Sequence, residues 1–151
     1  MVRMKIKNSA SVPPEECVFC KIAAKKLPSA IVFEDDRYIA FMDRSPFSLG
    51  HTLVCPKKHG ETVWDMTEPE IGGLFALAAK VSRAVMKVTE SDGFRFVQNN
   101  GEAANQMVAH VHVHVIPVKM SNKWQYMDRK TTALEELQAT AKQISSAMGS
   151  V

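Results

Sequence analysis

The clearest pattern of hydrophobic and polar positions lies late in the chain, where three histidines alternate with three valines in His110-Val111-His112-Val113-His114-Val115-Ile116-Pro117. Valine is β-branched and favours extended backbone, and successive residues of a strand point to opposite faces. We therefore predict a strand with valines facing a core and imidazoles on the other face. Because histidine is a mediocre core residue and strand former beside valine, three histidines in register indicate a functional site.

Four shorter apolar runs predict the remaining strands, over Ala30–Phe33, Tyr38–Met42, His51–Cys55 and Phe94–Gln98. Asp35-Asp36 predicts a tight turn between the first two runs, and Pro56 ends the third. The early strands are therefore expected to pair as neighbours.

Helical spacing of apolar residues predicts three helices. A short one covers Cys17–Lys26 before Pro28, with Phe19, Ile22 and Ala23 on one side. The longest begins at Thr67, where Thr67-x-x-Glu70 makes a capping box with Pro69 in the first turn, and its apolar stripe comprises Ile71, Leu74, Ala78, Val81, Val85 and Val88.

A final helix is predicted from a second capping box, Thr132-x-x-Glu135, with an apolar edge of Leu134, Leu137, Ala141, Ile144 and Met148. Short loops favour antiparallel pairing, and only the long helix makes a crossover of βαβ length. The predicted class is α+β, a five-stranded mainly antiparallel sheet with one long helix, a short N-terminal helix and a C-terminal helix. We expect a disordered leader over residues 1–16 and a single domain over 17–151.

Composition narrows the function. The chain of 151 residues is 46% hydrophobic and 23% charged, as in an ordinary globular protein. No apolar run approaches the roughly 18 residues of a membrane span. The net charge of +3 is dispersed, so we expect no dedicated nucleic-acid surface, whereas small anionic substrates are compatible. Three cysteines suggest a reducing compartment, so we expect the cytoplasm, with the nucleus open and organelle targeting by the basic leader a weaker alternative.

Two of those cysteines, Cys17 and Cys20, have the spacing of half a zinc site. A redox Cys-x-x-Cys motif is the alternative, weakened because no strand is predicted before it and the two intervening residues are apolar. On an extended strand His110 and His114 would lie about 13 Å apart, too far to bind one zinc ion together with His112. The three histidines must therefore have different roles.

The stretch His110–Ile116 resembles the signature of the histidine triad family, three histidines alternating with hydrophobic residues and followed by two more. The resemblance extends from Cys17 to Pro117 and includes the segments Cys17–Ile22, Val32–Asp36, Phe41–Asp43, Gly50–Val54 and Pro56–His59. It implies a five-stranded antiparallel sheet, a homodimer, and hydrolysis or nucleotidyl transfer at the α-phosphate of a purine nucleotide, with nucleoside phosphoramidates favoured.

The resemblance also assigns catalytic roles. His112 is the expected nucleophile, because a neutral imidazole attacks phosphorus without a separate base and leaves again from the adduct. His114 is expected to donate hydrogen bonds to the phosphate, and His51 to orient the nucleophilic imidazole or to lie beside the phosphate. Taken alone, a histidine such as His51 at a strand start is more often structural.

Nucleotide-binding residues follow in the same way. Asp43 matches the family's ribose-binding acid, and the other implied contacts are the amides Asn99 and Gln106 and the base-pocket residues Phe19, Ile22, Phe41 and Leu53. From spacing alone Asn99-Asn100-Gly101 is a simple turn, and the four apolar residues are equally consistent with plain core.

Some family members complete a Cys-x-x-Cys zinc site with two histidines. The resemblance therefore implies a structural zinc ion held by Cys17, Cys20, His59 and His110. A catalytic zinc bound by the triad itself is disfavoured by strand geometry.

Other functions stay open at this point. Dinucleoside polyphosphate hydrolysis and removal of adenylate from another molecule use the same chemistry, and a nucleotide-binding interaction protein with incidental hydrolysis is a non-enzymatic alternative. The chain departs from the family pattern at Asn105, where glycine is common. Trp124 matches only weakly a tryptophan that some relatives place near the partner's pocket.

Overall fold

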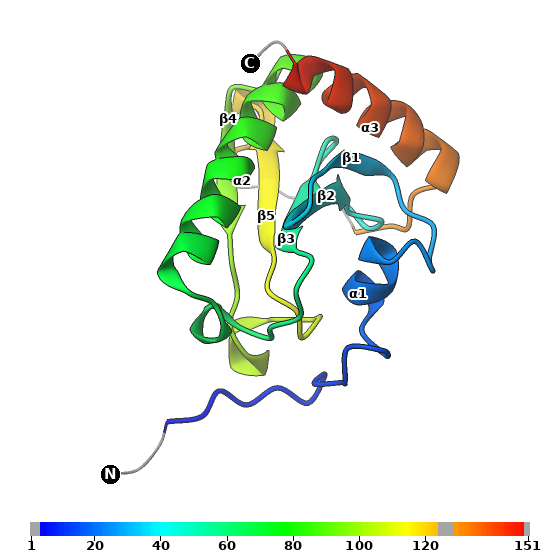
Figure 1. Cartoon of the computed structure of the whole chain (residues 1–151). Helices are drawn as coiled ribbons and strands as arrows, with labels where there is room; N and C mark the ends of the chain where they lie inside the picture. Colours follow the sequence, from blue (N-terminus) through cyan, green and yellow to red (C-terminus); the bar gives the residue numbers. More distant parts are fainter. Residues whose placement is uncertain (1–3, 124–128, 150–151) are drawn as a thin grey trace.

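A computed structural model describes residues 4–123 and 129–149, and Trp124 lies outside the described residues. The elements follow the predicted order (Figure 1), with bounds α1 Val18–Ala23, β1 Ile31–Glu34, β2 Tyr38–Met42, β3 Thr52–Pro56, α2 Glu68–Thr89, β4 Gly93–Val97, β5 Val113–Val118 and α3 Leu134–Met148. Short 3-10 turns lie at Val63–Asp65, Glu102–Ala104 and Met120–Asn122. No helix among the described residues is both long and apolar enough to span a membrane.

The five strands form one sheet in the order β1-β2-β3-β5-β4, and every neighbouring pair is antiparallel. The predicted α+β class is confirmed. The predicted tight turn between β1 and β2 is also present, because the Asp35 side chain accepts the backbone N–H groups of Arg37 and Tyr38.

Helices α2 and α3 cover one face of the sheet (Figure 1), and this face holds the larger core. Val111, Val113 and Val115 are fully buried there, as the alternating pattern predicted. Each buried valine contributes about 1.5–3 kcal/mol by removal from water. The predicted capping box of α2 is confirmed, since Thr67 accepts from the Glu70 backbone and the Glu70 side chain accepts from the Thr67 backbone.

Helix α1 lies against the opposite face. A smaller apolar cluster forms there from residues of α1 and its N-cap, β2 and β3, namely Cys17, Phe19, Ile22, Ile39, Phe41, Leu53 and Cys55. Side chains alternate along β2, so Ile39 and Phe41 join this cluster while Ala40 and Met42 join the other. The α1 face is also the face that receives the imidazoles.

Two predicted element starts are wrong. The last strand was expected from His110, but β5 begins at Val113, because the N–H of Val111 bonds to Gly60 O in the loop after β3 and leaves the ladder. The C-terminal helix was expected to be capped by Thr132, but α3 begins at Leu134 with Ala133 at the N-cap and no side-chain cap. The Thr132 N–H instead bonds to Arg44 O at 2.8 Å.

The described part of the N-terminal segment runs beside the loop that precedes β5. Asn8 Nδ2 donates to Gln106 Oε1 at 3.1 Å, and the Glu102 N–H donates to Lys7 O at 3.0 Å. Disorder of residues 1–16 stays a prediction.

Candidate active site and metal site

A cavity of about 850 Å³ opens on the α1 face of the sheet, beside the imidazoles. Most residues predicted to bind nucleotide line it together: Phe19, Ile22, Phe41, Asp43, Leu53, Asn99, His112 and His114. Phe47 and Arg129 also line it, although no motif pointed to either. The cavity size is that of a small-molecule pocket, which typically measures about 300–1,000 Å³.

The hydrogen bonds of His112 define its tautomer. Its Nδ1 lies 2.7 Å from the carbonyl oxygen of His110, an atom that can only accept. Nδ1 therefore carries the proton, and Nε2 keeps a lone pair. Because the ring lines the cavity, this is the arrangement that a nucleophilic imidazole requires.

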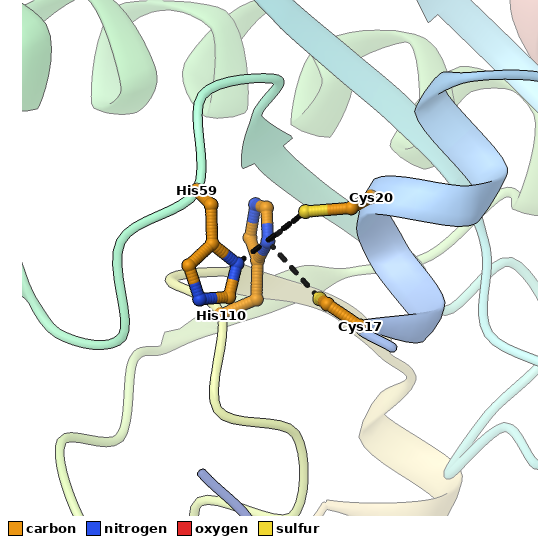
Figure 2. A group of neighbouring side chains, drawn as sticks. All are labelled: Cys17, Cys20, His59 and His110. Atoms are coloured by element: carbon orange, nitrogen blue, oxygen red, sulfur yellow. Dashed lines mark hydrogen bonds between the residues drawn. The ribbon is translucent and has the colours of Figure 1, made fainter. Parts of the chain in front are cut away.

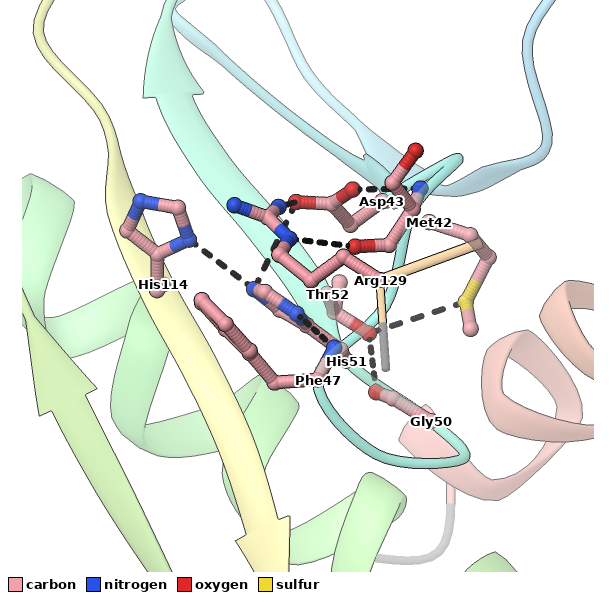
Figure 3. Close-up of polar contacts among 9 residues, drawn as sticks. Met42, Asp43, Phe47, Gly50, His51, Thr52, His114 and Arg129 are labelled. Carbon is pink, nitrogen blue, oxygen red and sulfur yellow. Dashed lines mark hydrogen bonds and ion pairs between the residues drawn. The ribbon is translucent and has the colours of Figure 1, made fainter. Parts of the chain in front are cut away.

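His51 and His114 form a second hydrogen-bonded chain (Figure 3). The backbone N–H of Phe47 donates to His51 Nδ1 at 3.0 Å, and His51 Nε2 lies 2.9 Å from His114 Nδ1. Since His51 Nδ1 accepts, its Nε2 carries the proton and donates it to His114 Nδ1. His114 is thereby left with an N–H at Nε2, available as a donor. His51 thus bonds to His114 and not to the expected nucleophile His112, whose Nδ1 bonds to the His110 carbonyl.

Burial keeps these imidazoles neutral. It is the main cause that lowers the pKa of His51 to about 2 and that of His114 to about 3, with neighbouring imidazoles and the positive charge of Arg129 adding to it. Burial also lowers the pKa of His112 from its usual value. The tautomers derived above therefore apply at pH 7.

Asp43 sits at the end of β2 with its side chain already partly engaged. Oδ1 accepts from the Ser45 N–H at 2.8 Å, and Oδ2 accepts from Arg129 Nη2 at 3.0 Å. Burial raises the pKa of the Asp43 carboxyl, while these donors and the Arg129 charge act in the opposite direction. His51 Nε2 is 3.6 Å from Oδ2, which links the acid to the imidazole chain.

Gln106 is placed differently from the other predicted residues. Its Oε1 accepts from the Gly101 N–H at 2.7 Å and its amide nitrogen donates to Glu61 O, so the side chain ties loops together instead of lining the cavity. Asn105, where the resemblance leads us to expect glycine, adopts a left-handed conformation with φ of 62°. Asparagine is one of the few residues other than glycine that adopt this conformation readily.

The four predicted zinc ligands converge from separate elements (Figure 2). Cys17 and Cys20 come from the start of α1, His59 from the loop after β3, and His110 from the segment before β5. Cys17 Sγ lies 3.4 Å from His110 Nδ1, Cys20 Sγ 3.5 Å from the same atom, and Cys20 Sγ 3.3 Å from His59 Nδ1.

These distances and the chemistry of the donors fit a zinc ion. Tetrahedral zinc, with bonds of about 2.3 Å to sulfur and about 2.1 Å to nitrogen, separates sulfur and nitrogen ligands by about 3.5 Å. His110 Nε2 donates to Pro56 O at 2.7 Å, which leaves the Nδ1 lone pair facing the cysteines. Burial raises the pKa of Cys20 to about 12, and a bound cation would offset that cost of a thiolate.

Comparison with known proteins agrees with the geometry. A family model described as the HIT domain matches residues 24–121. "Protein hit" of Bacillus subtilis is 45% identical over 68% of this chain and 71% of its own. Adenosine 5'-monophosphoramidase hnt1 of Schizosaccharomyces pombe is 36% identical over 67% and 73%. Adenylylsulfatase HINT3 of Arabidopsis thaliana is 36% identical over 75% and 57%.

Solved structures match over nearly the whole chain. A Hit-like protein from Bartonella henselae has a TM-score of 0.84 and 34% identity, covering 91% of this chain and 99% of that one. A zinc-bound histidine triad protein from Mycobacterium smegmatis has a TM-score of 0.81 and 29% identity, covering 91% and 96%. On the family model, the relatives and the placement of the triad beside a pocket, this chain belongs to the HIT, or histidine triad, family.

Proposed function

We propose that this chain hydrolyses purine nucleotides at the α-phosphate through a covalent nucleotidyl-His112 intermediate, with nucleoside phosphoramidates as the favoured substrates. The observation that carries the proposal is the tautomer of His112, whose Nδ1–H bonds to the His110 carbonyl and whose Nε2 lone pair is free beside the cavity. Relatives named as a monophosphoramidase and an adenylylsulfatase support cleavage next to an adenylyl group.

In the first step, the Nε2 lone pair of His112 attacks the α-phosphorus and the bond from phosphorus to the leaving nitrogen breaks. The leaving nitrogen takes up a proton from solvent water and departs as an amine. The His114 Nε2–H, held in that tautomer by His51, donates to the reacting phosphate and stabilises the charge that develops there.

The adduct makes the His112 ring cationic, because Nε2 is then bonded to phosphorus while Nδ1 keeps its proton. The His110 carbonyl oxygen, 2.7 Å from Nδ1, stabilises that charge. In the second step water attacks phosphorus and gives up a proton to solvent. The bond to Nε2 breaks, and the nucleoside monophosphate leaves with the neutral imidazole restored.

On the substrate side, Asp43 is proposed to accept from the ribose hydroxyls, and Phe19, Ile22, Phe41 and Leu53 to contact the base. Both assignments agree with the lining of the cavity. Gln106 is not included, because its side chain is engaged between loops.

The experiment that tests the proposal compares turnover of an adenosine phosphoramidate, a diadenosine polyphosphate and an adenylated lysine by the wild-type protein and by His112→Ala. We expect the phosphoramidate to be hydrolysed fastest and the variant to be inactive on all three. Faster cleavage of the diadenosine compound would shift the assignment to a dinucleoside polyphosphate hydrolase. Wild-type turnover of none of them would favour a nucleotide-binding interaction protein.

We also propose that Cys17, Cys20, His59 and His110 bind a structural zinc ion. Zinc would tie α1 to the loops that flank β3 and β5, and α1 supplies Phe19 and Ile22 to the cavity. Its contribution would be to the shape of the pocket and to the position of the His110 carbonyl, not to the bond-breaking step.

A homodimer is proposed through β4. This strand lies at the edge of the sheet, and it exposes Phe94 and Phe96 to 44% and 37%. An apolar edge strand is a surface that a second copy can cover. The double change Phe94→Lys and Phe96→Lys should convert a dimer to a monomer in analytical ultracentrifugation, while Trp64→Lys, at a residue exposed to 62%, should not. A wild-type monomer would contradict the proposal.

A further inference from the structure

Arg129, from the segment between β5 and α3, lines the cavity together with His112 and His114. Figure 3 shows its guanidinium beside Asp43 and His51. Its Nη2 donates to Asp43 Oδ2 at 3.0 Å, and its Nε donates to Ser45 O at 2.7 Å. The guanidinium carbon is 4.1 Å from the centre of the Phe47 ring, a cation–π distance. Three contacts of different kinds therefore hold this guanidinium in one place.

The charge of Arg129 reaches the catalytic imidazoles. Phe47, on which the guanidinium rests, also stacks on His51 with ring centroids 5.6 Å apart and 12° between the planes. After burial and neighbouring imidazoles, the Arg129 charge is a further cause of the lowered pKa of both His51 and His114. A positive charge thus lies close to the place where the proposed reaction needs one, while the imidazoles themselves are neutral.

Hydrogen-bond capacity shows that Arg129 does not exclude a ribose from Asp43. An ionised carboxylate has about four acceptor sites, and Ser45 and Arg129 use one on each oxygen. One site per oxygen is left, which matches the two vicinal hydroxyls of a ribose. A guanidinium has about five N–H donors, and the two bonds to Asp43 and Ser45 use two of them.

The balance of charge in the cavity also favours contact between Arg129 and a phosphate. Among the described residues that line the cavity, Asp43 is the single acid, and the arginines are Arg44 and Arg129. Of these two arginines, Arg129 is the one hydrogen-bonded to the Asp43 carboxylate. Without a cation on Oδ2, its carboxylate would repel a phosphate bound nearby. Arg129 neutralises it and retains donors for phosphate oxygens, for which the planar guanidinium is well suited.

We propose that Arg129 is a substrate-contacting residue that makes the pocket selective for anionic nucleotides over uncharged nucleosides. It neutralises Asp43 and donates hydrogen bonds to the α-phosphate, while Asp43 keeps its remaining acceptor sites for the ribose. The inference rests on the proposed function and adds to it the residue that recognises the phosphate charge.

Isothermal titration of AMP and adenosine, neither of which is turned over, tests this with wild type, Arg129→Ala and Arg129→Lys. We expect Arg129→Ala to weaken AMP binding about tenfold to hundredfold, the range for loss of a charged hydrogen bond, and to change adenosine binding less than about threefold. The affinity of Arg129→Lys for AMP should lie between those of wild type and Arg129→Ala, because lysine keeps the positive charge but lacks the paired N–H donors of a planar guanidinium. Arg83→Ala, at an exposed position of α2, controls for net charge and should match wild type.

Equal weakening of AMP and adenosine would overturn the proposal by showing a structural role for Arg129. Tighter binding of either ligand by Arg129→Ala would overturn it by showing that Arg129 blocks the pocket. If Arg129→Ala fails to fold by circular dichroism, Arg129→Lys must still weaken AMP relative to adenosine. Wild-type protein that hydrolyses a phosphoramidate while the variants bind AMP normally would refute this inference alone. A wild type that binds neither ligand and hydrolyses no phosphoramidate would remove the proposed function as well.

Discussion

Replacing His51 by alanine removes the donor that fixes the tautomer of His114. The change deletes the 2.9 Å hydrogen bond to His114 Nδ1 and leaves that nitrogen without its partner. An unpaired buried polar group costs about 1–3 kcal/mol. If that cost falls on the reactive tautomer, kcat/KM for an adenosine phosphoramidate should drop about tenfold to hundredfold. His114→Ala removes the donor to phosphate itself and should cost about a hundredfold to a thousandfold.

The double variant distinguishes a relay from two independent effects. Because His51 acts through His114, His51→Ala combined with His114→Ala should be hardly slower than His114→Ala alone. Steady-state hydrolysis of the three variants measures this, and rate losses that multiply would refute the relay. His51 is fully buried, so its truncation should also lower unfolding free energy by about 2–5 kcal/mol, as for other large core deletions. His51→Asn, which fills more of the space, provides a second variant if alanine unfolds the protein.

Three further predictions concern the metal, the backbone and pH. Purified protein should carry about one zinc ion per chain by elemental analysis. Cys17→Ser should lose the zinc and lower Tm by several degrees. Metal-free protein with an unchanged Tm would argue against the site. Gly50 has φ of +93°, and an added Cβ would lie 2.6 Å from Thr89 Cγ2. Gly50→Ala should therefore lower the free energy of unfolding, measured in urea, by at least about 1–3 kcal/mol. A Gly50→Ala variant as stable as wild type would show that this clash does not occur. Because the pKa of His51 is about 2 and that of His114 about 3, below the unfolded value of 6.5, the unfolded chain alone takes up their protons as pH falls. Tm should therefore be highest above pH 7 and decline below pH 6.5, with a shallower decline in His51→Asn. Equal slopes of Tm against pH in the wild type and the variant would contradict the lowered pKa of His51.

The fold followed from local patterns wherever one pattern decided the structure. Strand β2 begins and ends where its apolar run does, and α2 begins at its capping box. The start of β5 was mispredicted because alternation continues through His110 while the backbone of Val111 bonds to Gly60, a tertiary contact with no local signal. Thr132 failed as a cap for a similar reason, since its backbone N–H is taken by Arg44.

The candidate site divides in the same way. The imidazoles and cysteines lie in short motifs, so their chemistry was visible before their geometry. Arg129 and Phe47 have no such motif, and Arg129 reaches Asp43 across 86 positions of sequence. Gln106 lies in the expected loop, but its side chain is hydrogen-bonded to Gly101 and Glu61 and connects two loops. Sequence spacing contains no signal for these bonds.

The most direct test of the account is mass spectrometry of the intact protein and of its peptides, sampled during turnover of an adenosine phosphoramidate. The samples are quenched under conditions that preserve the acid-labile bond between phosphorus and histidine nitrogen. The account predicts an adenylyl group on the His112 peptide that appears within a turnover, decays once the substrate is exhausted, and is absent from His112→Ala. An adduct on another residue, or full turnover by His112→Ala, would contradict it.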